Sequence, residues 1–400
     1  MTEAKKTVLF EKHAALASKA QIVPFAGWMM PLWYQSISEE HAAVRKTAGL
    51  FDCTHMAVLK VSGADAANFL NIIATNDISM LKPGKAQYSY ILNPAGQIVD
   101  DIIIYYVDVD NFMVVANASN EQNVKNWLNI VTVEKIDIDP GWQYQVTDLK
   151  NPALPDAKVD IALQGPASAK CLNDIFGVDV SGIKPLNFVS VKTGEYDLIV
   201  SRTGYTGAKV GFEIFVHPDK AAALWDIILE KGKKLGVVPC GLGARDSLRI
   251  EAGLPLYGHE LAGDFGISPF QAGYDWAVKL DKKYFIGKEE IMKTLPIETE
   301  VARFKFDGSK GIRPIRQLDG IVNKDRRCIG HVLSCAKVDS QQVLLALVKK
   351  GYAVFGEKVG VYYVARNQQH IEEGKKERVA ICDSLSVDMK GITVERFEKF

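Results

Sequence analysis

The sequence predicts an α+β protein with a separate, β-rich C-terminal domain. Short strands and helices alternate along the first three quarters of the chain, and no glycine-rich dinucleotide fingerprint accompanies them. After about residue 295 the helical patterns thin out, and strand-like runs alternate with glycine and charged turns. Because 400 residues exceed one ordinary core, we expect a domain at 1–295 and a small β-barrel domain at 300–400.

Local signals support these elements in order. Ser36 and Glu39 form a capping box before a helix, for which Gly49 offers a left-handed stop. The turn sequence Asn93–Gly96 joins two β-rich runs and predicts a hairpin. Periodicity predicts strands at 51–63, 86–92, 97–107, 111–117, 159–165, 196–204, 212–218, 301–308, 327–335, 342–350 and 353–365, and further helices at 63–74, 119–131, 218–236 and 243–253.

Composition and charge exclude several classes of function. Lys plus Arg equals Asp plus Glu at 48 each, so the chain lacks the bulk positive charge that binds nucleic acid or an anionic membrane. No apolar run approaches the roughly 20 residues of a spanning helix, and the first residues show neither a secretory nor a transit pattern, so we expect a cytoplasmic protein. The cysteines form no C-x-x-C pair and the histidines lack ligand spacing, which predicts no metal site.

Two consecutive aspartates, Asp100 and Asp101, interrupt a strand-like run. Side chains alternate along a strand, so the two point to opposite faces, and at least one is expected to face an apolar interior. A carboxylate in that position needs hydrogen-bond donors or a shifted pKa. The alternative, that this is the solvated face of an edge hairpin, stays open on spacing alone.

A glycine-flanked tyrosine precedes another strand. Gly204 and Gly207 enclose Tyr205 in a tight turn that presents its ring, and Glu213 lies two residues inside the following strand. One ring and one nearby carboxylate suit a flat heterocycle that bears amino and N–H donors. An ordinary turn with a solvent-facing Glu213 fits the pattern equally well.

Two arginines, Arg245 and Arg249, lie one helical turn apart on the same side of a predicted helix. They could clamp a ligand carboxylate, or Asp246 and Glu251 could bridge them in a purely structural network. The aromatic and methionine cluster at 25–31 is more typical of a core than of a pocket.

Together, a dozen segments in the right order resemble the aminomethyltransferase (T-protein) family of the glycine cleavage system. The resemblance covers residues 7–290 and implies two interleaved α+β folate-binding domains plus the C-terminal barrel, arranged as a ring around tetrahydrofolate. The matching segments are LFEKH, FAGWMMP, GLFDCTHM, TNDI with PGKAQYS, LNPAGQIVDD, NASN, ALQGP, SRTGYTG, GFEI, GLGARDSLRIEAGLPLYGHEL and FIGKEEI.

The resemblance also implies an activity. Family members take an aminomethyl group from a lipoylated H-protein, a transient partner, release ammonia and leave 5,10-methylenetetrahydrofolate. Asp101 would lie near the reactive N5 and N10 edge of the folate and orient or activate the amine that receives the carbon. The implied folate-binding residues are Tyr205 and Glu213 at the pteridine, Arg245 on its helix, and Met56, Tyr88 and Asn117 at other pocket positions.

Three departures from the family pattern leave alternatives open. Ala208–Val210 replaces the acidic residues that usually follow TGYTG, Gln271 stands where glutamate is typical, and residues 332–335 replace a Thr-Ser-Gly turn. One alternative is a folate-dependent demethylase, which moves a methyl group from a small donor to tetrahydrofolate. The other is a non-catalytic folate-binding accessory protein, whose Lys-Gly-Cys segment this sequence lacks.

Overall fold

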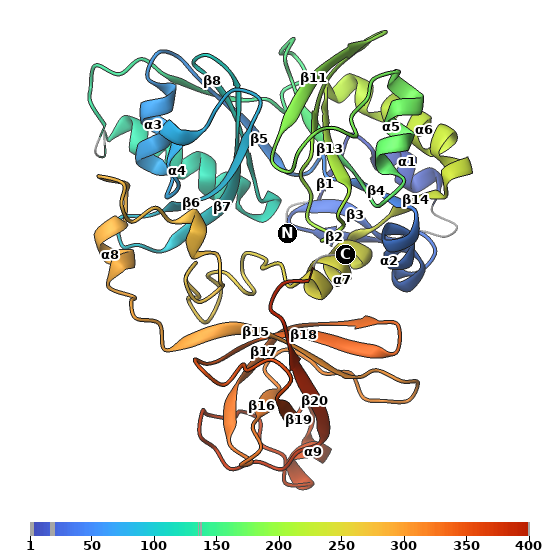
Figure 1. The fold of residues 1–400 in the computed structure, drawn as a ribbon, viewed down its shortest axis with the longest axis vertical. Helices are drawn as coiled ribbons and strands as arrows, with labels where there is room; N and C mark the ends of the chain where they lie inside the picture. The colour runs from blue at the N-terminus through green and yellow to red at the C-terminus, as the bar shows by residue number, and fades with distance from the viewer. Residues whose placement is uncertain (1–3, 17–20, 135, 137, 399–400) are drawn as a thin grey trace. The chain divides into compact units, whose positions relative to one another are not determined.

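The computed structural model describes residues 4–16, 21–134, 136 and 138–398, and the chain divides into two compact units (Figure 1). The first unit contains residues up to Arg245 together with Trp276–Lys293, and the second contains Asp246–Asp275 and the residues from Thr294 onward. The predicted domain boundary between 295 and 300 stays a prediction. Among the described residues, no helix combines the length and the apolar character needed to cross a bilayer.

One antiparallel sheet of the first unit has the strand order β6-β7-β8-β5-β9. The helices α3 and α4 cover one of its faces (Figure 1). The predicted hairpin between β6 and β7 is confirmed, with Gly96 at a positive φ of 73°. The elements are β5 (Ala57–Ser62), α3 (Ala66–Ile73), η1 (Ile78–Met80), β6 (Ala86–Leu92), β7 (Ile98–Asp108), β8 (Asn111–Ala116), η2 (Ala118–Asn120), α4 (Glu121–Val133) and β9 (Gln145–Asp148).

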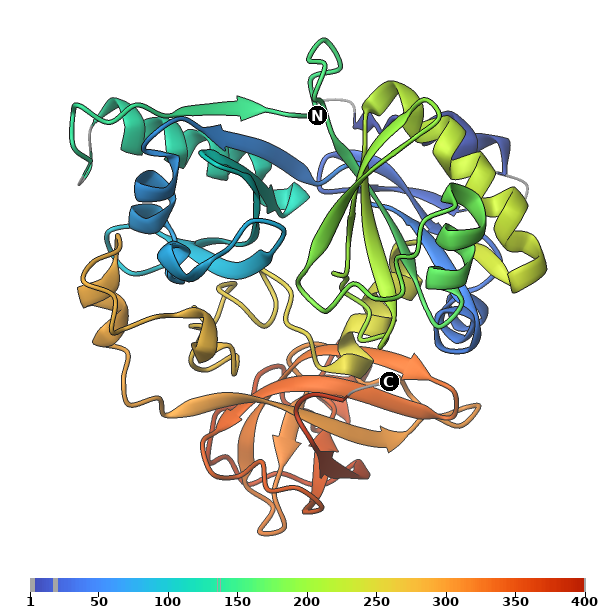
Figure 2. The same ribbon diagram turned by 45° about the horizontal axis from the view of Figure 1, so that its top comes forward.

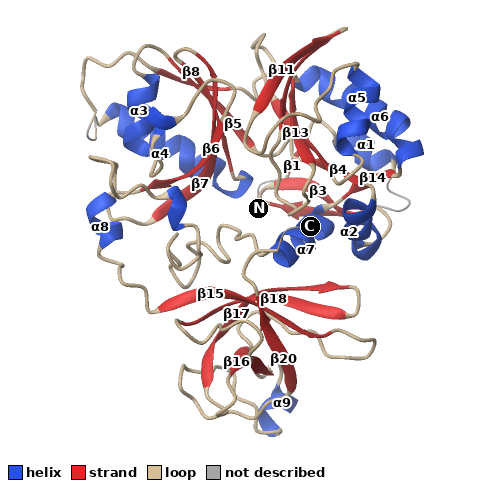
Figure 3. Ribbon diagram, viewed as in Figure 1, coloured by secondary structure: helices blue, strands red, loops and turns tan. Residues whose placement is uncertain are grey.

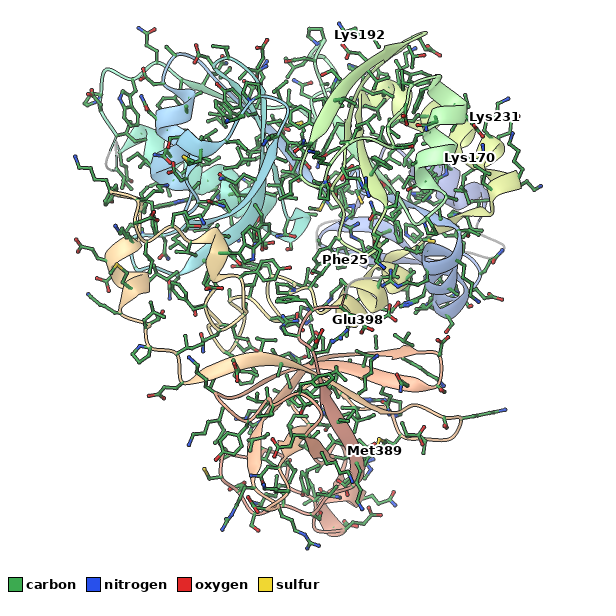
Figure 4. The ribbon with its side chains drawn as sticks, viewed as in Figure 1. Phe25, Lys170, Lys192, Lys231, Met389 and Glu398 are labelled. Carbon is green, nitrogen blue, oxygen red and sulfur yellow. The ribbon has the colours of Figure 1, made fainter. Side chains whose placement is uncertain are left out.

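A second sheet of the first unit has the order β11-β12-β13-β10-β4-β14. The helices α5 and α6 cover one face, and their Lys170 and Lys231 point away from it (Figure 4). The elements are β4 (Ala48–Asp52), β10 (Val159–Gln164), α5 (Ser168–Phe176), β11 (Phe188–Thr193), β12 (Tyr196–Ser201), β13 (Gly211–Val216), α6 (Pro218–Gly232), η3 (Lys233–Leu235) and β14 (Val237–Cys240).

The chain passes between these two sheets, so they are interleaved in sequence. The single strand predicted at 51–63 is wrong, because β4 and β5 belong to different sheets and the crossover Cys53–Met56 joins them. The helix-free faces of the two sheets turn toward each other (Figure 3). An inter-sheet cluster of apolar side chains from both sheets lies along these inner faces: Val58, Ala86, Tyr105, Met113, Val115, Leu149, Phe188, Ile199 and Phe215.

The N-terminal part adds a small sheet of order β1-β3-β2 and the helices α1 and α2. The capping box is confirmed, because Ser36 accepts a hydrogen bond from the backbone N–H of Glu39. Gly49 is not the helix stop; it lies inside β4, where a Cβ would come within 2.6 Å of neighbouring side chains. The elements are β1 (Lys5–Lys6), α1 (Phe10–Ala15), β2 (Gln21–Phe25), β3 (Trp28–Trp33) and α2 (Ile37–Lys46).

The apolar cluster at 25–31 is only partly core. Met30 in β3 is buried, whereas Phe25 at the end of β2 is 40% exposed (Figure 4). The pattern of large apolar side chains therefore indicated a core, but it did not predict the strands β2 and β3 or which of their side chains are buried.

The predicted C-terminal barrel is confirmed. It closes in the order β15-β18-β17-β16-β19-β20 (Figure 2), and its interior is apolar, with Phe304, Val332, Leu344 and Val361 fully buried. The strands are β15 (Thr299–Asp307), β16 (Gly320–Val322), β17 (Cys328–Val338), β18 (Gln341–Lys349), β19 (Lys358–Tyr362) and β20 (Met389–Val394). The remaining helical elements are α7 (Leu242–Ala252), η4 (Asp275–Ala277), α8 (Lys288–Met292) and α9 (Gln368–Glu372).

Candidate active site

The alternation of side chains along β7 gives this strand two different faces. Ile102 and Ile104 belong to the core beneath α3 and α4. Ile103 and Tyr105 pack in the inter-sheet cluster, so Asp101, two residues before Ile103, also belongs to the inner face. Because residues advance by about 3.3 Å along a strand, Asp101 and Tyr105 lie about 13 Å apart on that face.

Asp101 is half-buried and held by two side chains. Tyr88 Oη donates to Oδ2 over 2.9 Å, and Asn117 Nδ2 donates to Oδ1 over 2.8 Å. Burial raises the pKa of Asp101, whereas these two hydrogen bonds lower it, and the net shift is upward. Three residues that the resemblance assigned to the folate pocket, Asp101, Tyr88 and Asn117, therefore form one hydrogen-bonded cluster.

Asp100 points to the opposite face and is fully buried. The backbone N–H of Asn117 donates to Oδ2 over 2.8 Å, and the side-chain amides of Asn117 and Asn120 donate to Oδ1 over 2.9 and 2.7 Å. Burial raises the pKa of Asp100, and the neighbouring charge of Asp101 raises it further. The β6–β7 hairpin does lie at the edge of its sheet, but the alternative of a solvated face is wrong, because Asp100 is fully buried and Asp101 is half-buried.

A second polar cluster lies further along β7. Glu213 on β13 is 7% exposed, and its Oε2 accepts hydrogen bonds from Thr203 Oγ1 and, over 3.2 Å, from Tyr105 Oη. The solvent-facing alternative for Glu213 is therefore wrong. The sequence did not predict the Tyr105 donor, because Tyr105 is 108 residues away and belongs to the other sheet, whereas Thr203 lies only ten residues away in the SRTGYTG segment.

Arg245 and Tyr205 form the third part of the site. The guanidinium carbon of Arg245 lies 5.4 Å from the centre of the Tyr205 ring. Burial opposes the charge of Arg245, but nearby Cys53, Glu213 and other groups raise its pKa overall. Its buried Nη1 has no hydrogen-bond partner among the described residues, so part of its donor capacity is unused.

Arg249 does not join Arg245 in a clamp. Its Nη1 donates to Glu260 Oε2 over 2.6 Å, its Nε to Asp246 over 2.8 Å and its Nη2 to Ser334 over 3.0 Å, all within the second unit. The structural alternative is therefore confirmed for Arg249, with Asp246 as one of its partners. Arg245 alone of the two belongs to the unit that contains the Asp101 cluster.

Met56 ends the crossover and packs against the inter-sheet cluster. The inner faces thus carry two polar groups: the Asp101 carboxylate, held by Tyr88 and Asn117, and the buried Glu213, held by two hydroxyl donors. Apolar side chains from both sheets lie around them and keep the surroundings at low dielectric, which strengthens charge interactions there. Such an arrangement can hold an elongated ligand with hydrogen-bonding groups along its length.

Comparison with known proteins shows which family the chain belongs to. A model of the GCVT N-terminal domain family matches residues 10–282. The aminomethyltransferase of Desulforamulus reducens is 42% identical over 293 residues, which cover 73% of this chain and 76% of that protein. This chain belongs to the GCVT family of aminomethyltransferases.

Other members of the aminomethyltransferase family match nearly the whole chain. That of Thermoanaerobacter pseudethanolicus is 38% identical over 372 residues, covering 92% of this chain and 95% of that protein. The solved glycine cleavage system aminomethyltransferase T from Bartonella henselae superposes with a TM-score of 0.78 at 30% identity, covering 98% of this chain and 97% of that structure. The predicted family, the α+β class and the transferase class are confirmed.

The departures from the aminomethyltransferase pattern have local structural roles. Gln271 donates through Nε2 to Thr299 Oγ1 over 2.7 Å, and its Oε1 accepts from the backbone N–H of Ser268 over 2.9 Å. A glutamate could accept the second bond but not donate the first. The Ala208–Val210 turn is held by its backbone, because Arg202 donates to the Lys209 carbonyl over 2.7 Å.

Proposed function

We propose that this protein transfers a one-carbon unit from an aminomethyl-lipoyl H-protein to tetrahydrofolate, releases ammonia and forms 5,10-methylenetetrahydrofolate. The observation that carries the proposal is the inner-face carboxylate of Asp101, held by Tyr88 and Asn117 beside an apolar cluster. The family supports it, since the Bartonella henselae relative is a glycine cleavage system aminomethyltransferase. The lipoylated H-protein would be a transient partner, because it has to deliver its aminomethyl group and leave.

The side chains of the inner faces fit tetrahydrofolate chemically. Its pterin is a flat ring system that offers amino and N–H donors, and an ionised Glu213 is an acceptor. Both hydrogen bonds to Glu213 use Oε2, and among the described residues none is found to Oε1. The Tyr205 ring and the unused Nη1 of Arg245 add a flat apolar surface and a cationic donor. We therefore assign Glu213, Tyr205 and Arg245 to the pterin, with Met56 on the apolar wall.

Tetrahydrofolate supplies the amine nitrogens that receive the carbon. The role of Asp101 would be to orient the receiving amine and to hold its proton on the carboxylate. The same negative charge would stabilise the positive charge that develops on the carbon unit as ammonia leaves. Because burial raises the pKa of Asp101, its carboxylate can take up and release a proton closer to neutral pH than a solvated aspartate.

An ammonia-release assay tests this function. Purified protein is mixed with tetrahydrofolate and H-protein charged with the aminomethyl-lipoyl group, and Asp101→Asn serves as the matched variant because it keeps size and shape. We expect release that requires tetrahydrofolate and that falls at least about a hundredfold in Asp101→Asn, which should still bind the folate.

Two other results would contradict the proposal and identify an alternative. Formation of 5-methyltetrahydrofolate from a small methylated donor, without ammonia, would make the protein a demethylase. Tetrahydrofolate binding without turnover of either donor would make it an accessory protein. An Asp101→Asn variant with an unchanged rate would remove this residue from the chemistry.

A further inference from the structure

The N-terminal part of the first unit contains a buried polar relay that the proposed chemistry does not use. It joins His13 on α1, Tyr34 just after β3 and Asp52 at the end of β4. The Tyr34 hydroxyl lies 2.7 Å from His13 Nδ1, and His13 Nε2 lies 2.8 Å from Asp52 Oδ2. All three residues are at most 4% exposed, so water does not compensate for a lost partner.

Asp52 is the centre of this relay. Besides His13, its Oδ2 accepts from Thr7 Oγ1 over 2.9 Å, and its Oδ1 accepts from the backbone N–H and the hydroxyl of Thr54 over 2.8 and 2.7 Å. Four partners use the roughly four acceptor positions of a carboxylate. Burial alone would raise the pKa of Asp52, but the hydrogen bond and charge of His13 lower it to about 2, so the carboxylate is ionised at neutral pH.

The segment that Asp52 holds is the crossover between the two sheets. The crossover Cys53–Met56 lies outside both ladders, and its turn is closed by the Met56 N–H, which donates to the Cys53 carbonyl over 3.0 Å. On its other side, Lys150 Nζ donates to the His55 carbonyl over 3.1 Å. The buried Asp52 and the half-buried Lys150 therefore hold the crossover from two sides. Its last residue, Met56, packs against the inter-sheet cluster.

We propose that His13 and Asp52 are positioning residues that set Met56 in the tetrahydrofolate site. His13 orients the Asp52 carboxylate, the carboxylate holds Thr54, and Thr54 fixes the turn that ends at Met56. Burying the charged Asp52 costs free energy that apolar side chains in the same place would not cost. This cost argues that Asp52 and His13 position the crossover and do more than stabilise the fold. The statement that Met56 meets the folate rests on the proposed function.

The first test measures the position of Met56 without any folate. NMR spectra are recorded on protein labelled at the methionine methyl groups, and Met56→Leu identifies the signal. We expect Asp52→Ala and His13→Gln to shift or broaden the Met56 signal. The control is Thr47→Val just before β4, which removes a half-buried hydroxyl that lies within hydrogen-bond distance of the Ala43 and Gly236 carbonyls and should leave that signal in place.

The second test separates positioning from stability by steady-state kinetics. We expect Asp52→Ala to raise KM for tetrahydrofolate about tenfold or more while kcat falls less than about threefold, because ground-state and transition-state contacts are lost together. Asp52→Asn keeps an acceptor oxygen for Thr54 and should recover most of the KM. If Asp52→Ala does not fold, Thr54→Val removes only one hydroxyl and should raise KM about two- to fivefold.

The outcomes are distinguishable. An unmoved Met56 signal in Asp52→Ala, or an unchanged KM in a variant that folds, overturns the positioning role. A KM that rises equally in Thr47→Val also overturns it, because the effect would then follow stability alone. A shifted Met56 signal in a protein whose wild type does not bind tetrahydrofolate leaves the positioning of Met56 standing and refutes the proposed function.

Discussion

Asn117 joins the two adjacent carboxylates, and Asn117→Ala tests how the site holds them. Its Nδ2 donates to Asp100 over 2.9 Å and to Asp101 over 2.8 Å. Burial raises the pKa of Asp100 to about 8, so at neutral pH its bond to Asn117 is largely a bond to a neutral group and contributes about 0.5–1.5 kcal/mol. A bond to the Asp101 carboxylate contributes about 1.5–3 kcal/mol, which water can partly replace at this half-buried position. We therefore expect the free energy of unfolding to fall by about 2–4 kcal/mol. The backbone N–H of residue 117 keeps its bond to Asp100.

The same substitution should also change the pH dependence of turnover. The Asn117 hydrogen bond lowers the pKa of Asp101, so its loss raises that pKa and protonates the carboxylate at higher pH. If the reaction needs the ionised carboxylate, the acidic limb of kcat for ammonia release moves to higher pH, by about one unit if the bond is worth about 1.4 kcal/mol.

The matched variant is Tyr88→Phe, which removes the other hydrogen bond to Asp101 and leaves Asp100 untouched. It should move the acidic limb in the same direction with a smaller loss of stability. An acidic limb that stays in place in both variants, while urea unfolding confirms the loss of stability in Asn117→Ala, would refute the assignment of the limb to Asp101.

Three further predictions concern residues outside this cluster. Burial lowers the pKa of His55 from 6.5 to about 4, so the folded protein favours neutral His55. The free energy of unfolding should therefore fall by about 3 kcal/mol as the pH falls from 6.5 to 4, measured by urea unfolding. In His55→Asn this fall should be smaller. Arg245→Met should weaken tetrahydrofolate binding about tenfold or more in titration calorimetry. Arg249→Met should leave binding by the folded fraction unchanged, but it should lower the free energy of unfolding by about 3–5 kcal/mol, because it leaves the buried Glu260 without its ion-pair partner. Asp100→Asn should lower the melting temperature clearly more than Asp101→Asn, because its amide group would face N–H donors; equal melting temperatures would contradict this.

Local sequence signals predicted the elements that depend on neighbouring residues. The capping box at Ser36, the Asn93–Gly96 hairpin and four barrel strands (β15, β17, β18 and β19) depend on contacts or alternation within a few residues, and the structure contains them. The barrel strands β16 and β20 were not predicted. Gly49 misled the prediction because glycine has two uses. A glycine that ends a helix in a left-handed conformation cannot be told by sequence from one that allows neighbouring side chains to pack closely. Gly49 is of the second kind, because Cys240 and Val44 lie where a side chain on residue 49 would be.

The parts of the site that could not be predicted depend on long-range register. Tyr105 and Glu213 meet only because β7 and β13 face each other across the inter-sheet cluster, which no local pattern encodes. Likewise the strand-like segment at 51–63 gives no sign that the chain changes sheets at Cys53–Met56. The resemblance to the family named Asp101 and Glu213, but only the structure shows which donors hold them.

The surroundings of the adjacent aspartates depend on both the local alternation of side chains and the position of their strand in the sheet. Alternation along a strand requires that Asp100 and Asp101 point to opposite faces, and this follows from sequence alone. The position of β7 inside its sheet then decides that one carboxylate is surrounded by N–H donors and the other faces the inter-sheet space. The side-chain amide of Asn117 donates to both carboxylates, so the fully buried Asp100 fixes the amide that holds Asp101. The two aspartates share Asn117 and therefore form one hydrogen-bonded unit, so the effects of substitutions at the two positions should not be additive.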